Sequence, residues 1–223
     1  MAEAALHLIH PTNGNEATVS LLSEQEQARA ARFVFSEDAS RWINYRVGLR
    51  QILGASLGID PKLVPLIEGE GSKPALSPPY DHLEFNLSHV DDLAVVVVSK
   101  HGPVGIDLEP WSRARSLIEC AEVFCHPDEL MQLPSDTEER ATRLLEIWTS
   151  KEALLKALGT GLSYPPPQLK IVADHGLADT PLESLEDFRL LIPDHPGLTT
   201  HRIAVAVTAG IDGVEWHDGS LKS

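Results

Sequence analysis

The order in which helical and strand-like segments follow one another limits the fold of this chain more than any other feature of its sequence. Helical segments come first, because Ser23 and Glu26 form a capping-box pattern and apolar residues then recur at three- and four-residue steps. Strand-like segments follow, and Gly102-Pro103 between two of them indicates a hairpin. The same order then repeats. The predicted helices are 24–35, 37–57, 112–125 and 136–158, and the predicted strands are 83–87, 93–99, 104–109, 169–173, 188–192 and 201–209.

This repeated order predicts an α+β fold made of two similar halves with antiparallel sheets, joined near residues 102–111. A chain of 223 residues with 43% apolar residues can bury a sizeable core of this kind. Cys120 and Cys125 have no further ligands at the spacing of a zinc site, so we expect reduced structural thiols.

The charge and the apolar runs exclude several classes of protein. A formal net charge of −15 argues against binding to nucleic acids or to anionic membranes, which would require a basic stripe. The sequence has no uninterrupted apolar run of about 18 residues, so no transmembrane helix is predicted. Residues 1–10 lack the basic start of a secretory signal. We therefore expect a cytoplasmic protein, and we expect it to be a monomer.

Two carboxylates lie close together in the stretch from Gly105 to Pro110. In an extended strand Asp107 and Glu109 point to one face, while Ile106 and Leu108 point to the other and enter a core. Two neighbouring carboxylates repel each other unless a cation lies between them, and Mg²⁺ suits such hard oxygen ligands. The spacing alone also fits a solvated strand edge.

A second group of chemically active side chains lies on the helix predicted at 136–158. Trp148, Glu152 and Lys156 follow at i, i+4 and i+8, so they share one face of that helix. This face could carry only a surface ion pair between Glu152 and Lys156. A Trp on the same face favours a half-buried wall of a site.

Several residues before the carboxylates could contact phosphate. Ser88 and His89 end a predicted strand side by side, and either can donate to a phosphate oxygen, His89 when it is protonated. A turn-forming Ser beside an exposed His is the alternative. Lys73 offers a point charge, and Arg41 belongs to a group of arginines on the early helices.

Together these stretches resemble the surfactin-type 4′-phosphopantetheinyl transferases. The resemblance covers residues 21–166. It rests on Lys73-Pro74, Phe85-Asn86-Leu87-Ser88-His89, Val104-Gly105-Ile106-Asp107-Leu108-Glu109, and the motif from Trp148 through Lys151-Glu152-Ala153 to Lys156. In combination the last two motifs are highly specific. On the early helix, where family members commonly carry lysines for phosphate contact, this chain offers Arg29.

The resemblance implies two α+β halves, residues 1–103 and 104–223, with coenzyme A in the cleft between them. The first half would contact the nucleotide, and the second would hold Mg²⁺ and dock a carrier protein. The resemblance implies that Asp107, Glu109 and Glu152 are the metal ligands, and that Glu152 or a water that it orients is the general base. It implies that Lys156 contacts the attacked phosphate and that Ser88 and His89 contact the 3′-phosphate. Lys73 and Arg41 would contact the nucleotide end, and Lys151 would contact coenzyme A without a defined role.

The implied reaction is attack by a serine hydroxyl of an acyl or peptidyl carrier protein on the β-phosphate of coenzyme A, releasing adenosine 3′,5′-bisphosphate. A magnesium-dependent pyrophosphohydrolase of nucleotide derivatives would use the same residues with water as the nucleophile. A non-catalytic binding module is the third alternative, but all three carboxylate positions are filled. We expect the carrier protein to dock around Arg113, Arg115 and Leu117.

Overall fold

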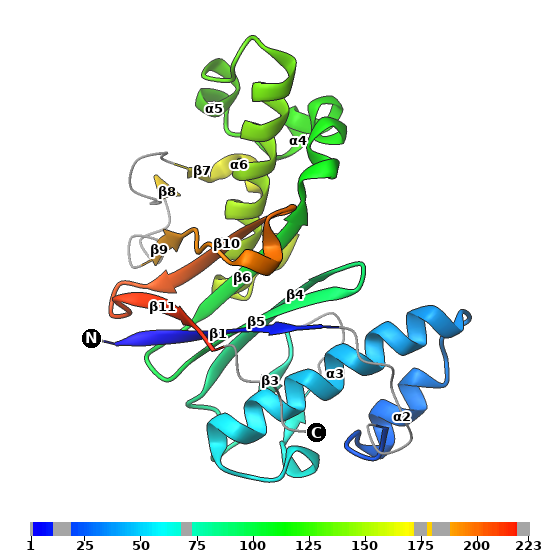
Figure 1. Cartoon of the computed structure of the whole chain (residues 1–223). Helices are drawn as coiled ribbons and strands as arrows, with labels where there is room; N and C mark the ends of the chain where they lie inside the picture. Colours follow the sequence, from blue (N-terminus) through cyan, green and yellow to red (C-terminus); the bar gives the residue numbers. More distant parts are fainter. Residues whose placement is uncertain (1, 11–18, 68–72, 172–177, 180–187, 218–223) are drawn as a thin grey trace.

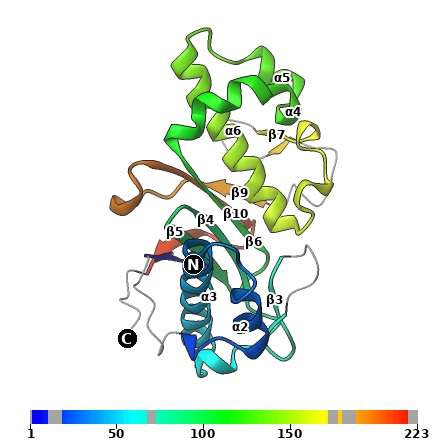
Figure 2. The ribbon, with the colours of Figure 1, turned by 90° about the vertical axis from the view of Figure 1, so that its right-hand side faces the viewer.

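The fold stacks helix, sheet, sheet and helix on one another. The computed structural model describes residues 2–10, 19–67, 73–171, 178–179 and 188–217 (Figure 1). The long helix α3 (Ser36–Leu57) covers one sheet and the equally long α6 (Thr137–Leu158) covers the other. Figure 2 shows the two helices on opposite outer sides of the stacked sheets. None of the helices in the described ranges is long and apolar enough to span a bilayer.

The sheet beside α3 has four strands in the order β11 (Gly213–Trp216), β1 (Glu3–Ile9), β5 (Leu93–Ser99) and β4 (Glu84–Val90). β4 and β5 form a hairpin in which Val90 pairs with Leu93, and Asp91 in its turn has a positive φ of 48°. β11 pairs with β1 in parallel, whereas the other pairs of this sheet are antiparallel. The last described strand of the chain therefore joins the sheet that contains the first.

The sheet beside α6 is antiparallel, with the order β6 (Val104–Pro110), β10 (His201–Thr208) and β9 (Phe188–Leu191). In its register Ala204 lies opposite Asp107, and Arg202 lies opposite Glu109. Alternation along the strands then divides the core into layers. On β10, Val205 and Val207 pack between the two sheets, while the alternate alanines pack against α6.

The helix ends carry the caps that the backbone requires. Asp136 accepts hydrogen bonds from two N–H groups in the first turn of α6, and Gly159 ends that helix in a left-handed conformation. α2 (Glu24–Ala30) opens with the predicted capping box between Ser23 and Glu26. The shorter elements are η1 (Pro61–Leu63), β2 (Leu66–Ile67), β3 (Ala75–Leu76), η2 (Trp111–Cys120), α4 (Ala121–Phe124), α5 (Pro127–Met131), η3 (Gly161–Ser163), η4 (Pro166–Gln168), β7 (Lys170–Ile171), β8 (Ala178–Asp179) and η6 (Pro196–Leu198).

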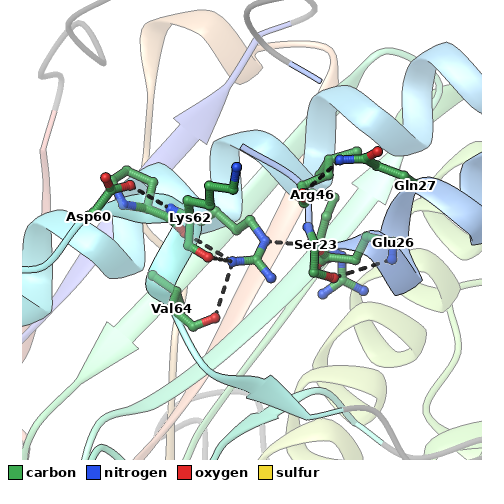
Figure 3. Close-up of polar contacts among 10 residues, drawn as sticks. Ser23, Glu26, Gln27, Arg46, Asp60, Lys62 and Val64 are labelled. Carbon is green, nitrogen blue, oxygen red and sulfur yellow. Dashed lines mark hydrogen bonds and ion pairs between the residues drawn. The ribbon is translucent and has the colours of Figure 1, made fainter. Parts of the chain in front are cut away.

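A buried ionic cluster fastens α2 to α3 (Figure 3). Glu26 accepts a hydrogen bond from Arg50 Nε at 2.7 Å and lies 3.4 Å from Arg46 Nε. The Arg50 guanidinium also donates to the backbone carbonyls of Pro61, Lys62 and Val64. Because buried charges are tolerated only with such partners, this cluster explains why two of the early arginines do not reach the solvent.

The mixed α+β class and most of the predicted elements are confirmed. The helices predicted at 37–57 and 136–158 and the strand at 93–99 lie at or within one residue of the observed bounds. The hairpin predicted at Gly102-Pro103 is wrong, because β5 pairs with β1 and β4 while β6 pairs with β10. The expectation of purely antiparallel sheets is corrected by the parallel β1–β11 pair.

Other predicted bounds also change. The first helix ends at Ala30 rather than at residue 35, and the stretch predicted as helix at 112–125 is mostly 3₁₀-helix. β1, β11 and α5 were not predicted. The end of the strand predicted at 169–173 lies outside the described residues.

Candidate active site

The two carboxylates of β6 lie on the face of their sheet that carries α6. Ile106 and Leu108 enter the core between the sheets, as the alternation predicts, so Asp107 and Glu109 point the other way. Gly105 precedes them on the same face, and a Cβ atom built there would lie 2.1 Å from the Ala153 carbonyl oxygen of α6. The absence of that side chain allows α6 to pack closely against β6.

The predicted face of α6 is directed at these carboxylates. Lys156 Nζ donates to Asp107 Oδ1 at 2.6 Å, and Trp148 Nε1 donates to Glu109 Oε1 at 3.1 Å. Glu152 lies between Trp148 and Lys156 on the helix. Burial raises the pKa of Glu152, and the negative charges of Asp107 and Glu109 raise it further. The structure therefore brings Trp148, Glu152 and Lys156 together opposite the strand pair, instead of leaving a surface ion pair.

β4 supplies a third side of the site. Ser88 Oγ donates to Asp107 Oδ1 at 3.0 Å and accepts from the backbone N–H of Leu108 and from Lys156 Nζ. Asn86 Oδ1 accepts from the backbone N–H of Ile106 at 2.9 Å. These two side chains take the place of a backbone ladder between β4 and β6. No role was predicted for Asn86, although its position two residues before Ser88 places both side chains on one face of the strand.

A cavity of about 410 Å³ opens where these elements meet. Its wall consists of Leu87, Ser88, His89, Val90, Asp107, Leu108, Glu109, Arg113 and Lys156. The His89 ring stacks on Tyr45 at a centroid distance of 4.8 Å. Partial burial and the nearby charge of Lys156 lower the pKa of His89.

The carboxylates also leave oxygens without partners. In the described part of the chain, Asp107 Oδ2 and Glu152 Oε1 are buried without a hydrogen-bond donor. A buried carboxylate oxygen without a donor is costly, and a cation would relieve it. No group of three His, Cys, Asp or Glu side chains among the described residues is already gathered closely enough to hold a metal. Asp107 and Glu109 are instead bonded by Lys156 and Arg113. The donor set consists of hard oxygens and fits Mg²⁺.

Comparisons with known proteins identify the family. The profile of the 4′-phosphopantetheinyl transferase superfamily matches residues 103–206, and that of the 4′-phosphopantetheinyl transferase N-terminal domain matches residues 11–101. The 4′-phosphopantetheinyl transferase HetI of Nostoc sp. is 36% identical over 159 residues, which cover 70% of this chain and 67% of HetI. The chain belongs to the 4′-phosphopantetheinyl transferase superfamily.

Other members of the superfamily are similar over comparable stretches. The 4′-phosphopantetheinyl transferase gsp of Aneurinibacillus migulanus is 33% identical over 66% of this chain and 60% of its own length. The 4′-phosphopantetheinyl transferase Sfp of Bacillus subtilis is 27% identical over 68% of this chain and 66% of its own length. The matched stretches thus span 60% to 67% of the lengths of these three relatives.

Three of the expected contact residues lie away from the cavity wall of this superfamily member. Lys151 was expected to contact coenzyme A, but it is fully buried, and its Nζ donates to Glu129 at 2.6 Å and to the carbonyls of Phe124 and Pro166. That expectation is corrected, because no donor remains for a ligand. Lys73 Nζ donates to the Val104 carbonyl at 2.9 Å. Arg41 is half-exposed and pairs with Asp92 in the β4–β5 turn and with Asp38.

The expected docking residues also need correction. Leu117 is only 3% exposed and belongs to a core beneath η2, so it cannot form part of a docking surface. Arg113 bonds to Glu109 inside the site. Arg115 remains exposed and pairs with Glu138. Cys120 and Cys125 are free thiols, as expected, and burial raises the pKa of Cys125 to about 12.

Proposed function

We propose that this chain transfers 4′-phosphopantetheine from coenzyme A to a serine of an acyl or peptidyl carrier protein in a magnesium-dependent reaction. The observation that carries the proposal is the pair of buried, unpartnered oxygens, Asp107 Oδ2 and Glu152 Oε1, beside the cavity. No hydrogen-bond donor of the described residues reaches these two oxygens, although Lys156 bonds to the other oxygen of Asp107. Membership of the superfamily supports the same reaction.

Asp107, Glu109 and Glu152 are the residues that we propose as metal ligands. They come from a strand and a helix whose separation is set by Gly105. Magnesium held there would polarise the phosphate oxygens of coenzyme A and orient its pyrophosphate. Glu152 is also the proposed acceptor for the serine proton, directly or through a water that it orients, because it faces the carboxylates of β6 beside the cavity.

The phosphate side of the proposed site consists of Ser88, His89 and Lys156. Lys156 retains 26% of its side-chain exposure, so its ammonium can turn from Asp107 toward a phosphate and offset charge in the transition state. His89 can donate to a phosphate oxygen from a ring N–H. Arg41, exposed beside the β4–β5 turn, is a further proposed contact for the nucleotide. Lys73 Nζ uses one of its three N–H groups on the Val104 carbonyl, and Lys73 is a further proposed contact at the nucleotide end.

In the proposed reaction the serine oxygen forms a bond to the β-phosphorus, and the bond from that phosphorus to adenosine bisphosphate breaks. The serine proton passes to Glu152 or to a water that Glu152 orients. Lys156 is placed to offset charge on the leaving oxygen. Such phosphoryl chemistry depends on position and charge more than on covalent help.

We divide the chain into two similar halves, 1–103 and 104–223, with the site in the cleft between them. The N-terminal family profile ends at residue 101 and the superfamily profile begins at residue 103, which supports the division. Each half also packs a helix of 22 residues on its sheet. β11 is an exception, because it pairs with β1 of the first half. One chain supplies every proposed ligand, which supports a monomer.

The proposed docking surface lies in the second half but differs from the one expected at first. Val123 of α4 is 72% exposed and Met131 of α5 is 78% exposed, whereas Leu117 is buried. Exposed apolar side chains suit a protein partner. We propose that they contact the carrier protein in place of Leu117.

The test is the intact mass of purified apo-carrier proteins from fatty-acid, polyketide and peptide synthesis, after incubation with this protein, coenzyme A and Mg²⁺. A gain of one phosphopantetheine on at least one carrier, abolished by a chelator, is expected. Unmodified carriers of all three kinds would contradict the proposal. Nucleotide release without a modified carrier would favour the pyrophosphohydrolase.

A further inference from the structure

Arg113, expected from the sequence to help dock the carrier protein, is a charged residue of the cavity wall. Its guanidinium donates from Nη1 to Glu109 Oε1, the same oxygen that accepts from Trp148. The guanidinium also lies over the Trp148 ring, 5.7 Å from its centroid. Arg113 therefore meets the proposed metal ligand and its supporting Trp in one place.

The two side chains of the Arg113–Glu109 ion pair differ in how far they are exposed to solvent. The Arg113 side chain is 43% exposed, whereas that of Glu109 is only 11% exposed. Glu109 is held on β6, whose strand pairing extends through Pro110. Arg113 follows on the 3₁₀-helix η2 and reaches back over one turn. The arginine can thus leave the pair while the carboxylate stays in position.

Each of the two carboxylates of β6 is paired with one basic side chain of the site. Lys156 bonds to one oxygen of Asp107, and Arg113 bonds to one oxygen of Glu109. Both cations line the cavity in which the phosphates of a substrate would lie. A divalent cation bound by Asp107 and Glu109 would displace Lys156 and Arg113 from these carboxylates. The Arg113 guanidinium then suits phosphate, because two of its N–H groups can bind two phosphate oxygens at once.

We propose that Arg113 is a resident counter-cation of Glu109, which holds that carboxylate while metal is absent and passes to a phosphate of coenzyme A when metal and substrate bind. The inference rests on the proposed function. Trp148 makes the exchange specific, because its N–H keeps Glu109 oriented after the arginine has left and its ring holds the guanidinium near the cavity. Arg113 therefore opposes metal binding in the free protein and favours binding of the substrate.

The test compares the affinities of wild type and Arg113→Gln for two probes. Mn²⁺ alone is titrated by the electron paramagnetic resonance of the free ion, and coenzyme A with Mg²⁺ is titrated by calorimetry. Arg113→Gln is expected to bind Mn²⁺ about tenfold more tightly, the order expected when a unit charge roughly 5 Å from a divalent cation is removed in a water-like medium. Coenzyme A is expected to bind about tenfold more weakly, because one charge-assisted contact is lost.

The opposite signs separate this role from a structural one, since a damaged site would bind both probes more weakly. Arg113→Lys should restore most of the wild-type behaviour toward Mn²⁺. Arg115→Gln, which removes a nearby exposed arginine paired with Glu138, should change neither affinity. Mn²⁺ affinity that is unchanged or lower in Arg113→Gln, or unchanged coenzyme A affinity, would overturn the inference. A wild-type protein that binds neither probe would refute the proposed function itself.

Discussion

Gly105 determines how near the helix that carries Glu152 and Lys156 can come to the strand that carries Asp107 and Glu109. Its missing side chain leaves room for the backbone of α6 at Ala153 and Ala157. Both contacts are with main-chain atoms, which cannot turn aside as a flexible side chain would. One residue without a Cβ therefore determines the separation of the proposed metal ligands.

Gly105→Ala is expected to lower the free energy of unfolding by about 1–3 kcal/mol, the usual cost of overpacking a core. It should also slow the transfer reaction more than stability alone explains, because α6 must shift. Urea unfolding and the rate of carrier modification check these effects. Gly213→Ala is the matched control, since a Cβ at this strand glycine meets no atom within 4 Å. Equal effects of the two substitutions would contradict the role of Gly105.

At the scale of elements, α6 uses two consecutive residues for opposite purposes. Glu152 faces β6, whereas Lys151 points into the protein interior and pairs with Glu129 of α5. Glu129 also accepts hydrogen bonds from the backbone N–H groups of His126 and Ile171. The buried pair therefore ties α6 to α5 and β7, and it fixes the rotation of the helix that directs Glu152 and Lys156 at the strand.

Lys151→Met should destabilise the protein by about 3–5 kcal/mol, because it leaves the Glu129 charge buried without its cation. Chemical unfolding measures this loss. Lys170→Met is the matched control, since Lys170 pairs with the neighbouring Asp128 at the surface and should cost no more than about 1 kcal/mol. The double variant Lys151→Met with Glu129→Gln should recover part of the stability. A small loss in Lys151→Met would contradict the anchoring role.

Local sequence patterns predicted the features of the site that depend on residues close together in the chain. Period-two alternation placed Asp107 and Glu109 on one face of β6, and period-3.6 spacing placed Trp148 and Lys156 on one face of α6. Features that depend on a strand distant in the sequence were not predictable from these patterns. The β6 strand pairs with β10, almost 100 residues later, so Gly102-Pro103 is a crossover between sheets rather than a hairpin.

The same limit applies to single side chains. Lys151 and Glu152 are adjacent in one motif, and only the packing of α5 reveals that the lysine is buried. The bond between Arg113 and Glu109 follows from how η2 turns back after β6, which spacing alone does not show. Asn86 and Ser88 gain their roles from an edge strand that meets another sheet.

At the scale of the whole molecule, the proposed site forms where the two sheets meet. On β4 of the first sheet, Asn86 accepts a hydrogen bond from the Ile106 backbone N–H and Ser88 donates one to Asp107. β6 of the second sheet provides the carboxylates. α6 completes the site from the outer side of the second sheet. The site therefore depends on the stacking of both sheets, and no single element could supply it.

The most direct test of this account measures carrier modification and adenosine 3′,5′-bisphosphate in the same reaction, for wild type and Glu152→Gln. If the protein transfers phosphopantetheine, the wild type releases one bisphosphate for each carrier that it modifies. Glu152→Gln should lower both rates together by at least about 100-fold, the lower end of the usual contribution of a general base. Bisphosphate released without modified carrier, or wild-type rates in Glu152→Gln, would contradict it.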